Sequence, residues 1–130
     1  MTVCVCGSML PEKDCCLKYI NGFEEAPTAL ALMRSRYTAF AKGEVDYLYN
    51  TYVLEWQKGH PYEEFQNAFQ QVTWKELEIV GVQHGGLKED TGEIEFVAHY
   101  QFRGAELSLH ERSSFRRESG SWRYVGGIFE

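Results

Sequence analysis

Long apolar runs are absent from this sequence of 130 residues. No stretch reaches the roughly 18 consecutive apolar residues that a membrane-spanning helix needs. The first four residues, Met1 to Cys4, lack both the basic residues and the apolar stretch of a secretory signal. These absences predict a cytoplasmic protein with no membrane association.

An excess of positive charge is also missing. The chain has 13 Lys and Arg against 19 Asp and Glu, which gives a formal net charge of −6. A nonspecific nucleic-acid binder needs a basic surface to displace counterions, so nucleic acid is not an expected partner. The arginines that come closest to a local basic patch are Arg112, Arg116 and Arg117.

Cysteine is absent after residue 16, and the four cysteines of the chain are Cys4, Cys6, Cys15 and Cys16. Cysteines that stabilise a fold through disulfide bonds are usually spread along the chain. Four cysteines crowded at one end indicate instead that they bind one group together. Four thiolates fill a closed tetrahedral zinc site and suit zinc better than magnesium or calcium. Two disulfides or four free thiols are the alternatives, although adjacent cysteines rarely bridge each other without strain. Because a closed site leaves no open coordination position, the metal is expected to be structural.

The chain is expected to contain two parts, a knuckle over residues 1–22 and a larger domain over residues 23–130. The first part is too short and too poor in large apolar residues to hold a shape by burial alone. Asn21-Gly22 is a plausible stop for a short helix that begins at Cys15.

The larger part reads as helices first and strands afterwards. Apolar residues at helical spacing predict a helix from Pro27 to Gly43, a second from Val45 to a break at Gly59, and a short third one from Tyr62 to Phe69. The spacing then changes to two, which predicts strands over residues 75–84, 94–102, 107–115 and 122–128. Strands joined by short turns form an antiparallel meander, so the predicted fold class is α+β, with helices covering one face of a curved sheet.

Two groups of residues resemble known families. Cys4-Val5-Cys6-Gly7-Ser8 followed by Cys15-Cys16 looks like the SEC-C motif, a zinc knuckle. Leu32 to Phe40, Glu111 to Phe115 and Trp122 to Tyr124 resemble the YchJ-like family of uncharacterised bacterial proteins. The resemblance covers nearly the whole chain. It implies an N-terminal SEC-C knuckle that holds zinc and a nuclear transport factor 2-like (NTF2-like) cone, a bent sheet closed by helices, often with a pocket inside.

The knuckle departs from the family pattern at three positions. Val5 stands where proline is frequent, Met9 stands where glycine usually follows the serine, and Lys13 is the only lysine of the loop. The four expected ligands are untouched. An electrostatic partner site of the kind that a basic loop provides is not expected here.

A carboxylate on an apolar strand face predicts a polar spot inside the larger part. Glu111 shares its face with Leu109 and Phe115, and burying a carboxylate costs free energy unless it is paired. On a helical wheel Arg34 falls within the apolar stripe of the first long helix, so Arg34 and Glu111 could meet. One interpretation is an ion pair that docks helix on sheet. The other is a binding pocket whose candidate residues are Arg34, Tyr37 and Glu111.

Two functions remain open at this point. The first is a zinc-binding protein-interaction or adaptor module, in which the knuckle binds a partner protein. The alternative is a small-molecule-binding protein or an enzyme that uses the pocket near Glu111 and Arg34. No phosphate loop, nucleophile elbow or zinc-protease pattern occurs, and no catalytic residue is predicted.

Overall fold

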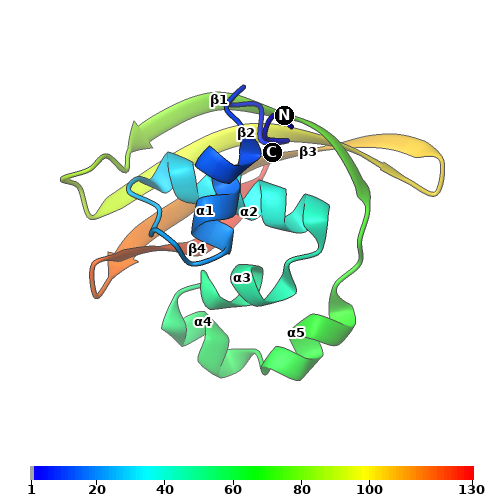
Figure 1. Cartoon of the computed structure of the whole chain (residues 1–130). Helices are drawn as coiled ribbons and strands as arrows, with labels where there is room; N and C mark the ends of the chain where they lie inside the picture. The colour runs from blue at the N-terminus through cyan, green and yellow to red at the C-terminus, as the bar shows by residue number, and fades with distance from the viewer. Residues whose placement is uncertain (1) are drawn as a thin grey trace.

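The computed structural model describes residues 2–130, so Met1, the first residue of the predicted knuckle, lies outside the described residues. A 3-10 turn at Glu12–Asp14 and five helices precede four strands (Figure 1). The helices are α1 (Cys16–Ile20), α2 (Ala29–Lys42), α3 (Val45–Asn50), α4 (Leu54–Gly59) and α5 (Tyr62–Ala68). The strands are β1 (Thr73–His84), β2 (Thr91–Phe102), β3 (Ala105–Glu118) and β4 (Ser121–Phe129).

Helix α2 has a defined cap at each end. The Thr28 hydroxyl accepts a hydrogen bond from the Ala31 amide at 3.0 Å, which is a typical N-cap contact. Gly43 ends the helix in the left-handed conformation, with φ of 74°, which glycine adopts without strain. The helix therefore begins at Ala29, two residues after the predicted start at Pro27.

The second predicted helix is two helices, α3 and α4, because residues 51–53 leave the helical path to pair with β4. The Tyr124 amide donates to the Thr51 carbonyl at 2.7 Å, and the Val53 amide donates to the Tyr124 carbonyl at 3.0 Å. Tyr52 bridges Tyr124 in a parallel sense. This pairing satisfies backbone groups that a continuous helix would have used internally, and it places the Tyr52 ring beside Tyr124.

The four strands form one antiparallel sheet in the order β1-β2-β3-β4. Helix α2 contacts β1, β2 and β4, and Figure 1 shows the helices gathered on one side of the curved sheet. The predicted α+β class, with helices on one face of an antiparallel meander, is confirmed.

A bulge in β4 changes which residues of that strand face the helices. Phe115 pairs with Tyr124 and Ser114 pairs with Gly126, so Val125 is the extra residue. An extra residue reverses the alternation of faces beyond it. Phe129 consequently pairs with Glu111 and lies on the helix side of the sheet, while Ile128 pairs with Arg112.

The buried core includes the four cysteines together with residues of α2 and the sheet, among them Leu32, Met33, Ile94 and Phe115. The division into segments 1–22 and 23–130 stays a prediction. Within residues 2–130, no helix combines the length and apolar character that crossing a bilayer requires.

Candidate functional site

The four cysteine sulfurs lie within 4.8 Å of one another. Cys15 Sγ is 3.6 Å from Cys6 Sγ and 3.9 Å from Cys16 Sγ. Four sulfurs at about 2.3 Å from a tetrahedral metal are about 3.8 Å apart, whereas a disulfide bond is about 2.05 Å long. The separations therefore suit a shared metal ion and not a pair of disulfides.

A short backbone loop brings the two cysteine pairs together. The Cys4 amide donates to the Leu10 carbonyl at 2.8 Å, and Val3 bridges Pro11 in an antiparallel sense. Gly7 turns the chain with a φ of 87°, a conformation that side chains disfavour. The second pair follows the 3-10 turn, with Cys15 before α1 and Cys16 as its first residue.

The four sulfurs interact strongly with one another. Hydrogen bonds with Cys16 and Cys6 lower the pKa of the Cys4 thiol, burial raises the pKa of Cys15, and the hydrogen bond with Cys4 raises the pKa of Cys16. The Ser8 hydroxyl lies 3.1 Å from Cys15 Sγ and can donate to it. Four adjacent sulfurs can all be thiolates only when a cation among them offsets their mutual repulsion. The donor set consequently fits a thiophilic metal held by Cys4, Cys6, Cys15 and Cys16.

One face of α2 carries the knuckle. Arg34 donates to the Cys6 carbonyl at 2.6 Å, Thr38 Oγ1 lies 3.7 Å from Cys4 Sγ, and Lys42 pairs with Glu12 at 3.3 Å. Residues 34, 38 and 42 are four apart, which places them in a row along the helix. The knuckle thus docks on α2 by a contact at each turn.

A cavity of about 300 Å³ lies on the other side of α2, between that helix and the sheet. Its wall is mainly apolar and aromatic, with a few polar groups. The lining residues are Met33, Arg36, Tyr37, Phe40, Tyr52, Trp74, Phe96, Ala98, Leu109, Glu111, Ser113, Tyr124 and Phe129. A concave apolar site with few polar groups is the usual form of a small-molecule site.

Glu111 is the acidic group of the cavity and is only 6% exposed. Its Oε2 accepts hydrogen bonds from the Ser113 hydroxyl and, at 2.8 Å, from the Tyr124 hydroxyl. Burial, together with the neighbouring Glu111, raises the pKa of Tyr124, so its hydroxyl stays protonated and acts as the donor. In residues 2–130 no donor reaches Oε1 of Glu111, which leaves acceptor capacity for a ligand.

Arg36 is the basic group of the cavity and is 4% exposed. Its Nη1 donates to the Leu48 carbonyl at 2.8 Å and to Thr51 Oγ1 at 2.6 Å. The guanidinium carbon lies 4.7 Å from the Tyr52 ring centroid and 4.4 Å from that of Tyr124, within the range of cation–π contacts. The charge is therefore held between two aromatic faces and the end of α3.

The three predicted pocket residues separate in the structure. Tyr37 and Glu111 line the cavity, and burial raises the pKa of Tyr37 to about 12. Arg34 lies on the knuckle face of α2, so the predicted meeting of Arg34 with Glu111 is wrong. Two residues along a helix amount to about 200°, which is why Arg36 faces the cavity while Arg34 faces away from it.

Sequence reasoning missed Arg36 and Tyr124 in the cavity wall, and Gly127 beside Glu111. Arg36 could have been found, because it falls three residues after Met33 and four before Phe40, on their stripe. Tyr124 precedes the bulge and shares its face with Trp122, so alternation along β4 indicates its side. Gly127 lies beyond the bulge, which no local signal marks. A Cβ added at Gly127 would collide with the Glu111 carboxylate, so that the buried acid needs glycine there.

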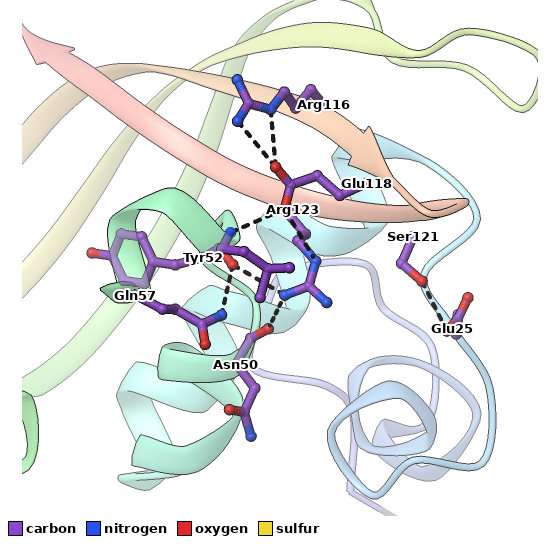
Figure 2. A network of polar contacts seen from close by, with 9 residues as sticks. Glu25, Asn50, Tyr52, Gln57, Arg116, Glu118, Ser121 and Arg123 are labelled. Atoms are coloured by element: carbon purple, nitrogen blue, oxygen red, sulfur yellow. Dashed lines mark hydrogen bonds and ion pairs between the residues drawn. The ribbon is translucent and has the colours of Figure 1, made fainter. Parts of the chain in front are cut away.

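The arginines that could form a basic patch are already paired. Arg112 lies 3.7 Å from Glu95 and 3.4 Å from Glu130, and Arg116 lies 3.0 Å from Glu118. Figure 2 shows Glu118 between Arg116 and Arg123, while Arg123 also donates to the carbonyls of Asn50 and Tyr52. Arg112 and Arg116 therefore each have an acidic partner on the same surface. That nucleic acid is not a partner stays a prediction.

The chain is similar in sequence to one protein-family model and to several curated bacterial proteins. The family model described as "YchJ, middle NTF2-like domain" matches residues 28–127. A UPF0225 protein of Streptomyces coelicolor is 39% identical over 97% of this chain and 94% of the relative. A UPF0225 protein of Corynebacterium efficiens is 40% identical over 98% of this chain and 94% of that protein.

Solved structures agree with the fold. The solution structure of a SEC-C motif containing protein from Rhodopseudomonas palustris has a TM-score of 0.85 at 33% identity, covering 98% of both chains. The crystal structure of a SEC-C motif containing protein from Psychrobacter arcticus has a TM-score of 0.81 at 24% identity and covers 100% of this chain and 84% of the other. The predicted combination of an NTF2-like domain with an N-terminal SEC-C cysteine cluster is confirmed.

Proposed function

The chain belongs to the YchJ-like family with an NTF2-like domain, and we propose that it is a zinc-stabilised small-molecule-binding protein. The observation that carries the proposal is the buried Glu111 carboxylate at the wall of an aromatic cavity. A buried acid costs free energy unless its hydrogen-bonding capacity is used, and two donors use only one of its oxygens.

Zinc is the proposed metal of the knuckle. Four thiolates with tetrahedral separations suit zinc best among common cellular cations. The closed donor set assigns the metal a structural role, because no coordination position remains for a substrate. Through Arg34, Thr38 and Lys42 the knuckle then holds the helix that forms one wall of the cavity.

Quinoline, an uncharged two-ring compound, tests whether the cavity binds small molecules. In ¹⁵N-resolved NMR titrations of the zinc-loaded protein, we expect saturable shifts on α2 and β3. Ala98→Leu, at a buried cavity position, should abolish them, whereas Ala105→Leu, at an exposed position of β3, should leave them unchanged. Absence of saturable shifts in the wild type with quinoline, indole and benzofuran alike would contradict the proposal.

A second candidate function is the binding of a partner protein by the knuckle. The observation in its favour is that Val5, Met9 and Leu10 are 45%, 77% and 51% exposed on a loop held by the metal site. Apolar side chains on a rigid loop are suited to burial against another protein. This proposal treats the knuckle as an adaptor surface.

Quantitative affinity capture from cells tests the adaptor role. Met9→Ser combined with Leu10→Ser should remove a specific partner while metal content stays at one per chain. Leu87→Ser, which changes an equally exposed residue far along the chain, should keep the partner. Identical captured proteins for all three baits would contradict the role.

A further inference from the structure

The polar groups of the cavity restrict what kind of molecule it can hold, and this step rests on the proposed small-molecule function. We infer that the cavity binds an uncharged, planar aromatic compound that donates an N–H to Oε1 of Glu111. The inference follows from the hydrogen bonds already made in the cavity, from its charge, and from the shape of its wall.

The hydrogen-bond inventory favours a donor on the ligand. A carboxylate accepts at about four lone-pair positions and donates none when ionised. Ser113 and Tyr124 both donate to Oε2, which leaves Oε1 as the acceptor that the protein itself does not use. Arg36 uses both N–H groups of Nη1 on Leu48 and Thr51 and keeps Nε and Nη2 for an acceptor, whereas a donor on the ligand finds its acceptor at Glu111.

The charge of the cavity favours an uncharged ligand. One acid, Glu111, and one base, Arg36, line the same space. Within residues 2–130, Arg36 has no ion-pair partner inside 4.0 Å, and its charge rests against the rings of Tyr52 and Tyr124. A cationic ligand would add a second positive charge to a poorly solvated space, and an anionic one would oppose Glu111.

The shape of the wall favours a flat ring. Tyr37 and Trp74 meet edge to face, with centroids 5.6 Å apart, and Trp74 also contacts Phe40 at 6.1 Å. Aromatic walls of this kind accept another ring in stacked or edge contacts. A volume near 300 Å³ is at the small end of ligand pockets, which suits a compound of one or two rings.

Indole and benzofuran separate the donor requirement from shape. The two compounds have the same ring frame, but only indole has an N–H. On the zinc-loaded protein we expect indole to bind at least about tenfold more tightly than benzofuran, as charge-assisted hydrogen bonds are strong. Dissociation constants come from ¹⁵N-resolved NMR titrations followed on β3.

Two variants and a third compound locate the acceptor. Glu111→Gln should reduce the preference for indole to about threefold or less, while the matched change Glu93→Gln, at an exposed strand position, should leave it intact. N-methylindole has the rings of indole but no N–H, so the wild type should bind it about as weakly as benzofuran. This measurement keeps the test valid if Glu111→Gln does not fold.

The outcomes distinguish this inference from the proposed function. Equal binding of indole and benzofuran by the wild type, a preference unchanged in Glu111→Gln, or binding of N-methylindole as tight as that of indole would overturn the donor requirement and leave a small-molecule site. Absence of binding for quinoline, indole and benzofuran alike at millimolar concentration would overturn both.

Discussion

Helix α2 separates two sites that are built in different ways. On one side, the knuckle takes all four candidate metal ligands from residues 4–16 and docks through contacts four residues apart. On the other side, the cavity gathers side chains from α2, β1, β2, β3, β4 and the segment around Tyr52. A metal ion can replace a hydrophobic core in a short segment, whereas a cavity depends on strand register over the whole sheet.

The largest effect should come from the knuckle. Cys16→Ser removes one of four ligands, and structural zinc in small modules contributes folding free energy of about 10 kcal/mol or more. We expect metal content to fall well below one per chain and the free energy of unfolding to drop by about 3 kcal/mol or more. Metal analysis and urea unfolding measure both.

Ser8→Ala is the matched control for the cysteine variant, because it removes only a hydroxyl beside Cys15 Sγ. It should keep one metal per chain and cost about 1 kcal/mol or less. If Cys16→Ser retained full metal content and unchanged stability, the cysteine cluster would not be the element that holds the knuckle.

The second comparison sets the two faces of α2 against each other. Arg36→Met removes two hydrogen bonds and two aromatic contacts from a buried site, so we expect a cost of about 3 kcal/mol in the free energy of unfolding. Arg34→Met removes one hydrogen bond from a part-buried site and should cost about 1 kcal/mol. Urea unfolding of both zinc-loaded variants checks this order, and equal costs would contradict it.

The third comparison uses two adjacent glycines of β4. A Cβ at Gly127 would collide with Glu111, whereas a Cβ at Gly126 would meet nothing within 4 Å. We expect Gly127→Ala to cost about 2 kcal/mol and Gly126→Ala to stay within about 0.5 kcal/mol of the wild type. Chemical denaturation gives both values. Tolerance of alanine at Gly127 would mean that Glu111 lies elsewhere.

The smallest effect concerns the polar network at the edge of the cavity region (Figure 2). A hydrogen bond from the Leu54 amide, together with Arg116, lowers the pKa of Glu118. A lowered folded-state pKa means that the stabilisation is present above the ordinary carboxyl value of about 4.3 and is lost as the pH falls through the folded value.

We expect this contribution to be about 0.5 kcal/mol because Glu118 pairs with Arg116 at a partly exposed site, where ion pairs contribute little. Urea unfolding of the wild type and Glu118→Gln between pH 6 and pH 3 should show a stability difference that shrinks toward acid. Glu63→Gln, at an exposed position of α5, serves as the control. A difference that is independent of pH would contradict the assigned role of the carboxylate.

Much of the architecture could be predicted because its signals are local. The cysteine spacing, the glycine that ends α2 and the alternation along β2 each follow from neighbouring residues. The α+β class, the meander and the candidate metal ligands therefore came from the sequence. The break between α3 and α4 could not, because residues 51–53 pair with Tyr124, some 70 positions later.

The composition of the cavity was predicted only in part. Glu111 and Tyr37 face inward as their spacing indicates, but the helical wheel favoured Arg34 where the structure has Arg36. Both arginines border the apolar stripe, and the choice depends on which face of α2 meets the knuckle. Phe129 and Gly127 reach the cavity region through the bulge at Val125, a feature of pairing between strands.

The four-residue spacing of Arg34, Thr38 and Lys42 has a consequence for how this family can change its length. Each residue added to an α-helix rotates everything beyond it by about 100°. A single-residue insertion midway along α2 would turn the later contacts away from the knuckle and the later aromatic rings away from the cavity together. The same insertion in the linker at residues 23–26 would keep the knuckle contacts and the cavity rings of α2 in place. We therefore expect relatives to differ in length in that linker and not within the helix.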